Sequence, residues 1–403
     1  METMKQLRHE ALDCLTRQIL PFWLQQMQDP EKGGWYGRMD GSGTLHKDAP
    51  RGAILYARLL WTFSSAYRVL SALPLGIDTG VLQQYHTVAT QTARYIQDHF
   101  LDPEYGGTYW NIDAEGRPLD TKKQFYALGF MIYGFSEYAR ATGCTRARET
   151  AMQLFSLIET HAMDTEYGGY IEACTRNWQP ISDMRLSEKD ENFPKSQNTH
   201  LHILEPYTNL FRIAPVPEVE KALRNLLHLF TDRIINPSTY HLGQFFQMDW
   251  TRMGALESYG HDIECSWLLH EAALVLNDKE LSDRVESIVR EVAKASEKGL
   301  QPDGSMAYET GDADRHWWVQ AETVVGFLNL YQHFGDKEAL QKALRCWDYI
   351  RRHLIHPKYG EWYWSIRADG TPNQQDDLAG FWKCPYHNSR MCLEIIERSF
   401  AIS

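Results

Sequence analysis

The sequence has no long apolar run and no run of basic residues, and each absence excludes a class of protein. No stretch reaches the roughly 18 apolar residues of a membrane-spanning helix, so we expect no membrane partner. Without about five consecutive basic residues, and with a net charge of −12, we expect no nucleic acid partner. A signal peptide needs an apolar segment where METMKQLRHEALDCL carries charges, so we expect a cytoplasmic protein.

Cysteine patterns are also missing. The seven cysteines are odd in number and include no C-x-x-C pair. This excludes a disulfide framework and a zinc ribbon, and it predicts reduced, mostly buried thiols. Aromatic residues, in contrast, are abundant, with 13 Trp, 21 Tyr and 16 Phe. Such rings fill hydrophobic cores and also stack on sugar rings, and composition alone leaves both roles open.

A turn phrase rich in glycine and aromatic residues recurs along the chain. Its clear copies are separated by roughly 65 residues or by a multiple of that period. Six such units account for the 403 residues, and an internal repeat overrides a domain count taken from length. The clear copies lie at 29–43, 102–118, 164–180 and 356–372, with a weaker one at 300–309.

Each unit contains two segments with apolar residues at helical spacing, which predicts about twelve helices. The first of each pair is amphipathic and should face solvent, whereas the second is apolar nearly all round and should be buried. Six buried helices inside six amphipathic ones form an all-α (α/α)6 barrel, with the turn phrases as short hairpins or loops at one rim. No linker divides the chain, so we expect a single catalytic domain, 1–403. The segments lie near 4–27, 51–71, 79–100, 121–141, 145–163, 196–213, 216–235, 258–276, 279–297, 313–334, 336–355 and 383–400.

One of the buried segments, 196–213, contains a proline. Pro206 lacks an amide donor, and its ring crowds the carbonyl of His202. We therefore expect this helix to be kinked or broken there.

Unusual polar side chains open most of the buried segments. Alternate helices of a barrel run the same way, so these residues should converge at one rim. Taken singly, each has a structural interpretation, because a buried histidine is usually a hydrogen-bonded core residue and an arginine can anchor a carboxylate. Together they favour a functional site over several unrelated structural needs. The residues are Arg58, Asn198, His200, His202, His261, Glu264, Trp318, Glu322, Trp382 and His387.

A metal site and a hydrolase site are the main alternatives. His200, His202 and Glu205 are metal-ligand types, but on a helix the two histidines lie about 200° apart and cannot chelate together. Glu264 and Glu322 are a candidate carboxylate pair for glycoside hydrolysis. Two histidines at the same mouth instead favour moving a carbon-bound proton next to a carbonyl. A sugar-binding protein without catalysis would leave these histidines unexplained.

Five phrases in the buried segments also carry a family resemblance. They are ILYARLLW (54–61), NTHLHILE (198–205), SYGHDIECSWLL (258–269), WWVQAETVVGF (317–327) and WKCPYHNSRMC (382–392). With them the sequence resembles the N-acylglucosamine 2-epimerase superfamily, and within it most of all the enzymes that act on cellobiose. The similarity covers essentially the whole chain. It implies an (α/α)6 barrel, in agreement with the repeat.

The resemblance implies an isomerase that needs no cofactor and no metal. The enzyme would epimerise the reducing-end glucose of a β-1,4-linked disaccharide at C2, turning cellobiose into glucosyl-mannose and lactose into epilactose. Alternatives are a mannose 2-epimerase, a mannose isomerase or an N-acylglucosamine 2-epimerase, and next a glycoside hydrolase of the same fold. The expected partner is a small sugar, bound by a chain that works as a monomer or weak homo-oligomer.

The resemblance also implies a role for each candidate residue. The chemistry is consistent with these roles, because an open-chain aldehyde acidifies the C2 proton and a buried arginine stabilises the anionic enediolate. The implied roles are acid/base catalysis for His261 and His387, binding and polarising O1 and O2 for His202 and Arg58, holding the histidines for Glu264 and Glu322, stacking on the sugar for Trp318 and Trp382, and lining the pocket for Asn198.

Overall fold

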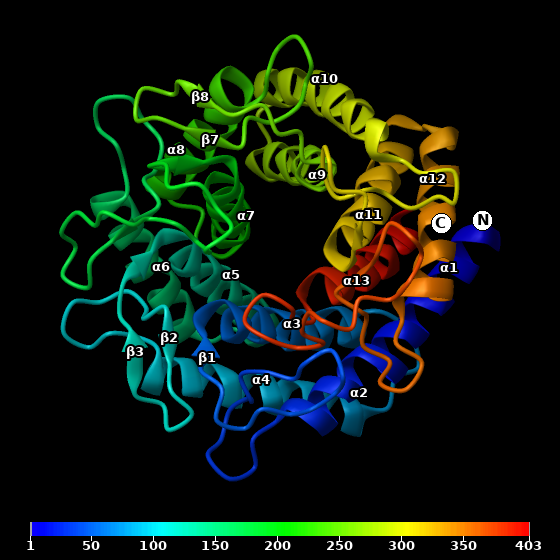
Figure 1. Cartoon of the computed structure of the whole chain (residues 1–403), viewed down its shortest axis with the longest axis horizontal. Helices are drawn as coiled ribbons and strands as arrows, with labels where there is room; N and C mark the ends of the chain where they lie inside the picture. Colours follow the sequence, from blue (N-terminus) through cyan, green and yellow to red (C-terminus); the bar gives the residue numbers. More distant parts are fainter. Residues whose placement is uncertain (1, 403) are drawn as a thin grey trace.

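The computed structural model describes residues 2–402, whose helices form two concentric rings (Figure 1). The arrangement confirms the predicted all-α (α/α)6 barrel, and the helices match the expected segments to within a few residues at their ends. Within the described residues no helix is long and apolar enough to cross a membrane. The inner ring consists of α3 (Ala53–Ala72), α5 (Phe125–Thr142), α7 (Gln197–Ile213), α9 (Tyr259–Leu276), α11 (Trp317–Phe334) and α13 (Tyr386–Ala401). The outer ring consists of α1 (Glu2–Cys14) with its continuation α2 (Leu20–Phe22), then α4 (Thr79–His99), α6 (Thr145–His161), α8 (Pro217–Leu229), α10 (Lys279–Ser296) and α12 (Lys337–Tyr349).

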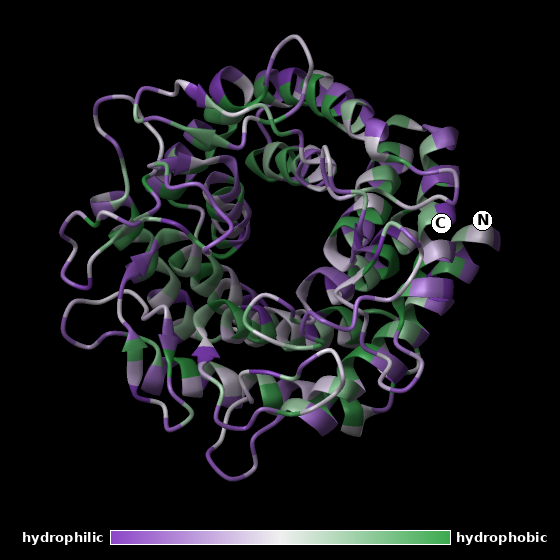
Figure 2. Cartoon of the chain, in the orientation of Figure 1, coloured by the Kyte–Doolittle hydropathy of each residue, from purple (hydrophilic) through white to green (hydrophobic). Residues whose placement is uncertain are grey.

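The hydrophobic pattern of each helix determines whether it lies in the inner or the outer ring. In α5, all residues from Phe125 to Ala139 are buried, as expected for a helix packed on every side. In α10, burial follows one stripe that includes Leu281, Val285 and Val289, and the other face is polar. Figure 2 shows the hydrophobic residues mainly on the helices and largely hydrophilic loops over one rim.

Short antiparallel strands join neighbouring repeats at that rim. A strand or bridge just before an inner helix pairs with the turn that follows the next outer helix, as β4 before α5 pairs with β5 after α6. The ring is closed in the same way by the bridge from Met39, after the first outer helix, to Ala379, before the last inner one. The strands are β1 (Arg51–Gly52), β2 (Asn111–Ile112), β3 (Pro118–Asp120), β4 (Lys123–Gln124), β5 (Ala173–Cys174), β6 (Lys195–Ser196), β7 (Phe245–Phe246), β8 (Arg252–Met253), β9 (Arg315–His316) and β10 (Ser365–Ile366).

Buried ion pairs stabilise the turns of the repeat. In the second unit, Asp102 accepts hydrogen bonds from Lys123 Nζ and Arg176 Nε, each at 2.8 Å. Asp102 lies in the turn after an outer helix, and Lys123 lies directly before the next inner helix, so the pair fixes where that inner helix begins. Equivalent pairs recur in three other units, as Asp29–Arg51, Asp164–Lys195 and Glu361–Lys383.

Pro206 neither breaks α7 nor ends it, so of the two expected outcomes, a kink or a break, the break is excluded. The helix runs without interruption from Gln197 to Ile213. The proline leaves the carbonyl of His202 without its intrahelical donor, and α5 packs against this point. A Cβ on Gly129 of α5 would lie 2.4 Å from the His202 carbonyl oxygen, so glycine permits the close approach.

Candidate active site

A cavity of about 920 Å³ opens at the rim where the inner helices begin. Of the other two predicted residues, Glu322 lies behind one of the cavity-lining histidines, and His200 lies outside the site. The convergence expected from helix polarity is therefore present in the structure. The predicted residues that line the cavity are Arg58, Asn198, His202, His261, Glu264, Trp318, Trp382 and His387.

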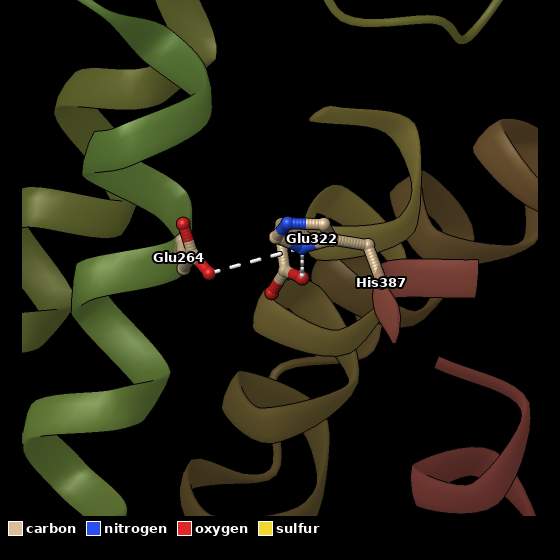
Figure 3. A group of neighbouring side chains, drawn as sticks. All are labelled: Glu264, Glu322 and His387. Atoms are coloured by element: carbon tan, nitrogen blue, oxygen red, sulfur yellow. Dashed lines mark hydrogen bonds and ion pairs between the residues drawn. The ribbon is translucent and has the colours of Figure 1, made fainter. Parts of the chain in front are cut away.

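His387 is oriented by a carboxylate on the neighbouring helix. Its Nδ1 lies 2.7 Å from Oε1 of Glu322, and Trp267 Nε1 donates to the other oxygen at 2.9 Å. Because an ionised carboxylate only accepts, Nδ1 carries the proton and Nε2 is left unprotonated. Burial raises the pKa of Glu322, but Arg390 and His387 bring it down to about 2, so it is ionised at neutral pH. Figure 3 shows Glu264 and Glu322 both turned toward His387.

Arg390, which the sequence interpretation did not single out, joins three of the buried carboxylates. Its Nη2 donates to Glu264 Oε1 at 2.8 Å and to Glu322 Oε1 at 2.6 Å. Its Nη1 donates to Glu205 Oε1. All four side chains are buried. A guanidinium presents several donors in a fixed plane, which suits this bridging position.

The pKa of Glu264 is shifted in the opposite direction to that of Glu322. Burial and the nearby Glu322 hold the pKa of Glu264 well above its usual range. Its Oε2 is buried and accepts no hydrogen bond within the described residues. The resemblance implied that Glu264 holds a histidine, but its contacts run to Arg390, and His387 Nδ1 lies 3.9 Å away.

His202 forms a second histidine–carboxylate pair on α7. Its Nδ1 lies 2.8 Å from Oε2 of Glu205, three residues later on the same helix. Burial raises the pKa of Glu205 to about 7, against the opposing effect of Arg390. Burial also lowers the pKa of His202 well below its usual range, so the imidazole is neutral at neutral pH. The rings of Tyr126 and Phe130 pack against it.

His261 approaches the cavity from α9 without a carboxylate behind it. Its Nδ1 lies 2.8 Å from the hydroxyl oxygen of Ser258. The indole of Trp318 lies against both His261 and His387, with ring centroids 4.8 and 5.7 Å apart. Burial lowers the pKa of each histidine to about 3, so both are neutral at neutral pH.

Arg58 is a buried cation with no carboxylate partner. Only 3% of its surface is exposed, and it forms no salt bridge among residues 2–402. Its Nη2 donates to the hydroxyl oxygen of Tyr126 at 3.0 Å, and its Nε has no partner. The guanidinium stacks on Phe130 and Tyr386. An unpaired buried charge is costly, so this arrangement favours an anionic ligand in the cavity.

The outer part of the cavity presents unused acceptors and aromatic walls. The side-chain oxygen of Asn198 and one oxygen of Glu172 are buried and have no hydrogen-bond partner among the residues that the structure describes. Unsatisfied buried acceptors indicate where a ligand hydroxyl or water donates. Trp382 is half-buried in the loop that precedes α13 and packs edge-on against Trp110 and Tyr126. This combination suits a ligand with many hydroxyl groups and a ring.

His200 does not belong to the site. Its Nε2 accepts from the Tyr170 amide at 2.9 Å, and its Nδ1 lies 2.7 Å from the Ser196 carbonyl oxygen. Both ring nitrogens are therefore engaged away from the cavity, whereas His202 lines it. The two histidines point apart, as the helical spacing predicted, so a shared metal ion is not favoured.

Another group of donors also resembles a cation site. One oxygen of Glu264, one of Glu322 and a ring nitrogen of His387 lie within 4.8 Å of one another. Arg390 Nη2, however, already contacts both carboxylates at hydrogen-bond distance. A cation between them would meet a guanidinium at close range, so the arrangement favours an ion-pair cluster.

Two residues of the site, Arg390 and Glu205, were not among the site residues predicted from the sequence. Arg390 and Glu205 each stand three residues after a candidate histidine, on the same helix face. Both are charged residues in otherwise apolar helices, which is the signal that identified the other candidates. Glu205 lies eight residues into α7, deeper than the other candidates, and was considered only as a metal ligand. Arg390 lies four residues into α13, no deeper than Glu264 or Glu322 in their helices, so the same signal could have identified it.

The comparisons with known proteins agree with this geometry. A sequence model of N-acylglucosamine 2-epimerase matches residues 34–389. The chain is 52% identical over 396 residues to a cellobiose 2-epimerase of Bacteroides fragilis, covering 97% of this chain and 98% of that protein. The solved cellobiose 2-epimerase of Bacillus thermoamylovorans B4167 superposes with a TM-score of 0.91 at 39% identity, covering 98% of this chain and 100% of that one.

A more distant structure shares the fold alone. A D-mannose isomerase superposes with a TM-score of 0.81 but is only 18% identical, with 98% of this chain and 97% of that one covered. The same barrel is therefore found in a protein named for a different sugar isomerisation, so the fold alone does not identify the substrate. The residues around the cavity determine it.

Proposed function

This chain belongs to the N-acylglucosamine 2-epimerase family and is a sugar 2-epimerase, and on that premise we propose that it acts on β-1,4-linked disaccharides. It converts the reducing-end glucose to mannose, so cellobiose gives glucosyl-mannose and lactose gives epilactose. The name of the Bacteroides fragilis relative supports cellobiose as a substrate. A cavity of about 920 Å³ is at the large end for small-molecule sites and supports a ligand of two rings.

Arg58 is the observation that carries the proposed chemistry. The ring of the reducing-end sugar opens to an aldehyde, and removal of the C2 proton gives an enediolate. Its negative charge on O1 and O2 needs a cation, and Arg58 is a buried guanidinium without a carboxylate partner. A preorganised charge in a partly dry site lowers the energy of such an anion by several kcal/mol. His202, also at the cavity wall, donates or accepts at the same oxygens.

Two imidazoles exchange the C2 proton. His387 and His261 border the cavity from different helices, α13 and α9, and one takes the proton from one face of C2 while the other returns a proton to the opposite face. Glu322 fixes the tautomer of His387 so that Nε2 is the reactive nitrogen. Trp318, which packs on both rings, and Trp382 at the wall supply stacking faces for the sugar.

The decisive experiment uses sugars in deuterated water. Cellobiose, lactose, glucose, mannose and N-acetylglucosamine are incubated separately with the protein, and products are identified by NMR. We expect the disaccharides to gain a reducing-end epimer with one deuterium at C2 and an intact glycosidic bond. Free glucose from cellobiose would indicate hydrolysis by Glu264 and Glu322. Turnover of mannose alone would indicate a monosaccharide epimerase, and a ketose as the main product an isomerase of the mannose type.

A further inference from the structure

A single guanidinium ties together the two histidine–carboxylate pairs of the site. Arg390 donates to one oxygen of Glu205, whose other oxygen lies against His202 Nδ1. It also donates to the Glu322 oxygen that lies 2.7 Å from His387 Nδ1. Glu205 and Glu322 come from α7 and α11, and Arg390 comes from α13. Without this bridge, neither pair would be connected to the other.

We propose that Arg390 is a positioning residue that joins the two histidine–carboxylate pairs, together with Glu264, into one buried unit. Its positive charge sets the net charge of this unit so that the unit holds one transferable proton. The inference rests on the proposed two-histidine reaction and deepens it. Three carboxylates, Glu205, Glu264 and Glu322, face two guanidiniums, Arg390 and Arg58. With all of them ionised and the histidines neutral, one negative charge remains, and a single added proton neutralises it.

The groups that face this unit come from every inner helix. Glu271 is paired with Arg212 at 2.7 Å, so it adds no net charge to the unit. Among the described residues Arg390 and Arg58 are then the cations that set the balance, and only Arg390 contacts the carboxylates directly. The pKa of Glu322 is lowered, whereas burial raises that of Glu264 well above its usual range and that of Glu205 to about 7, so the added proton is held by one of these last two carboxylates. The groups are Arg58 from α3, Tyr126 and Tyr133 from α5, His202 and Glu205 from α7, His261, Glu264 and Glu271 from α9, Glu322 from α11, and Cys384, Tyr386, His387 and Arg390 from α13 and the residues before it.

Inversion at C2 needs this one proton. The proton on C2 passes to the first imidazole, and the C–H electron pair becomes the C1–C2 double bond of the enediolate. The second imidazole, which has taken up the added proton of the unit, then gives that proton to the opposite face of C2, and the double-bond electrons form the new C–H bond. The site therefore begins and ends each turnover with one proton beyond that on C2. With no added proton the site has no acid to reprotonate C2, and with two added protons it has no base to remove the C2 proton.

The test is the bell-shaped pH dependence of kcat, whose two limbs report the loss and the gain of a proton by the unit. Arg390→Met removes the positive charge at similar length. We expect both limbs to move to higher pH by about one to three units, because the more negative unit binds each proton more tightly. Arg390→Lys keeps the charge but loses the bridging geometry, so it should lower kcat with limbs close to those of the wild type.

Glu205→Gln provides the opposite change. It removes one negative charge, so both limbs should move to lower pH. The double variant Arg390→Met/Glu205→Gln restores the charge balance and should return the profile toward the wild type. Limbs that stay in place in Arg390→Met, or that move the same way in both single variants, would overturn the proposal. If Arg390→Met does not fold, Glu205→Gln decides alone, and unmoved limbs in that variant contradict the charge balance.

A measurement without substrate separates this inference from the proposed function. The imidazole resonances of His202 and His387 are titrated by NMR in the wild type and in each variant. We expect the same directions, upward for Arg390→Met and downward for Glu205→Gln. Wild-type protein that fails to epimerise any disaccharide would refute the substrate proposal alone. Active wild type with histidine titrations unaffected by either variant would refute the role of Arg390 alone.

Discussion

His387 turns Nδ1 toward Glu322 at 2.7 Å, which leaves the other ring nitrogen for the cavity. We therefore expect Glu322→Gln to lower kcat at least tenfold, roughly the loss seen when a residue that orients a functional histidine is removed. KM should change little, because Glu322 does not line the cavity. Steady-state kinetics on cellobiose test this. The control is Glu338→Gln, an exposed carboxylate on α12 whose side chain is 79% exposed. A drop in both variants would point to a general effect.

Arg58 and Arg68 make a matched pair on α3. Arg58→Met should lower kcat by about 10²–10³-fold, because it removes the charge that stabilises the enediolate. Its melting temperature should stay the same or rise, since no ion pair is broken. Arg68→Met breaks contacts with Glu137 and Glu397 far from the cavity, so it should lower the melting temperature and spare kcat. A strongly destabilised Arg58→Met would mean that this guanidinium serves the fold.

Much of the fold could be predicted from the sequence, because the repeat and the hydrophobic pattern depend on residues close together in the chain. Each helix pair alternates one amphipathic and one apolar segment, as α10 and α5 illustrate. The effect of Pro206 on α7 could not be predicted from the sequence, because the helix stays continuous where it packs against Gly129 of a different helix. Tertiary packing there outweighs the local cost of the proline.

The polar residues at the starts of the inner helices could also be predicted from the sequence, but the contacts between side chains of different helices could not. Arg390 is 185 residues from Glu205, 126 from Glu264 and 68 from Glu322. Such contacts depend on how four helices are rotated about their axes, and a spacing rule within one helix carries no information about that. For the same reason, the sequence could not reveal the partner of Glu264, which contacts Arg390 and not the histidine that the resemblance implied.

The ion pair of Asp102 with Lys123 should contribute strongly to stability. Burial raises the pKa of Asp102, but Arg176 and Lys123 more than offset this and hold it below its usual range. Its stabilisation is therefore present above about pH 4, the unfolded pKa of aspartate, and is lost as the pH falls toward the lower folded pKa. We expect Asp102→Asn to lower the free energy of unfolding by about 3 kcal/mol at pH 7, with the difference shrinking on acidification.

Denaturant titrations at several pH values measure this effect. The control is Asp283→Asn, whose partner Lys279 is 86% exposed, and which should cost less than about 1 kcal/mol. Equal losses for the two variants, or a loss for Asp102→Asn that grows in acid, would contradict the assignment of Asp102 to a buried stabilising pair.

Activity should not depend on a divalent ion. Both nitrogens of His200 are bound to the backbone, and the carboxylates beside His387 already contact Arg390. We expect exhaustive treatment with a chelator to leave kcat unchanged. Activity that disappears with the chelator and returns with a divalent ion, but not with a monovalent one, would reopen the question of a metal at Glu264 and Glu322.

The two-histidine arrangement makes the most specific prediction. If His261 and His387 serve opposite faces of C2, His261→Asn and His387→Asn should each stop net epimerisation in both directions, because inversion needs both. Each variant should still exchange the C2 proton of one epimer with solvent deuterium through its remaining histidine. Since one positioned base contributes about 10²–10⁴-fold to the rate, NMR should separate the two exchange rates clearly.

The identity of the exchanging epimer tests the geometry. The family resemblance assigns His387 to the gluco form and His261 to the manno form, so His261→Asn should exchange the glucose end and His387→Asn the mannose end. Glu322 orients only His387, and Glu322→Gln should therefore slow exchange of the gluco form more than that of the manno form. If both histidine variants exchanged the same epimer equally well, the opposed-face arrangement would be wrong. One of the two would then be a binding residue, and His202, with its own carboxylate at 2.8 Å, would be the next candidate for the second base.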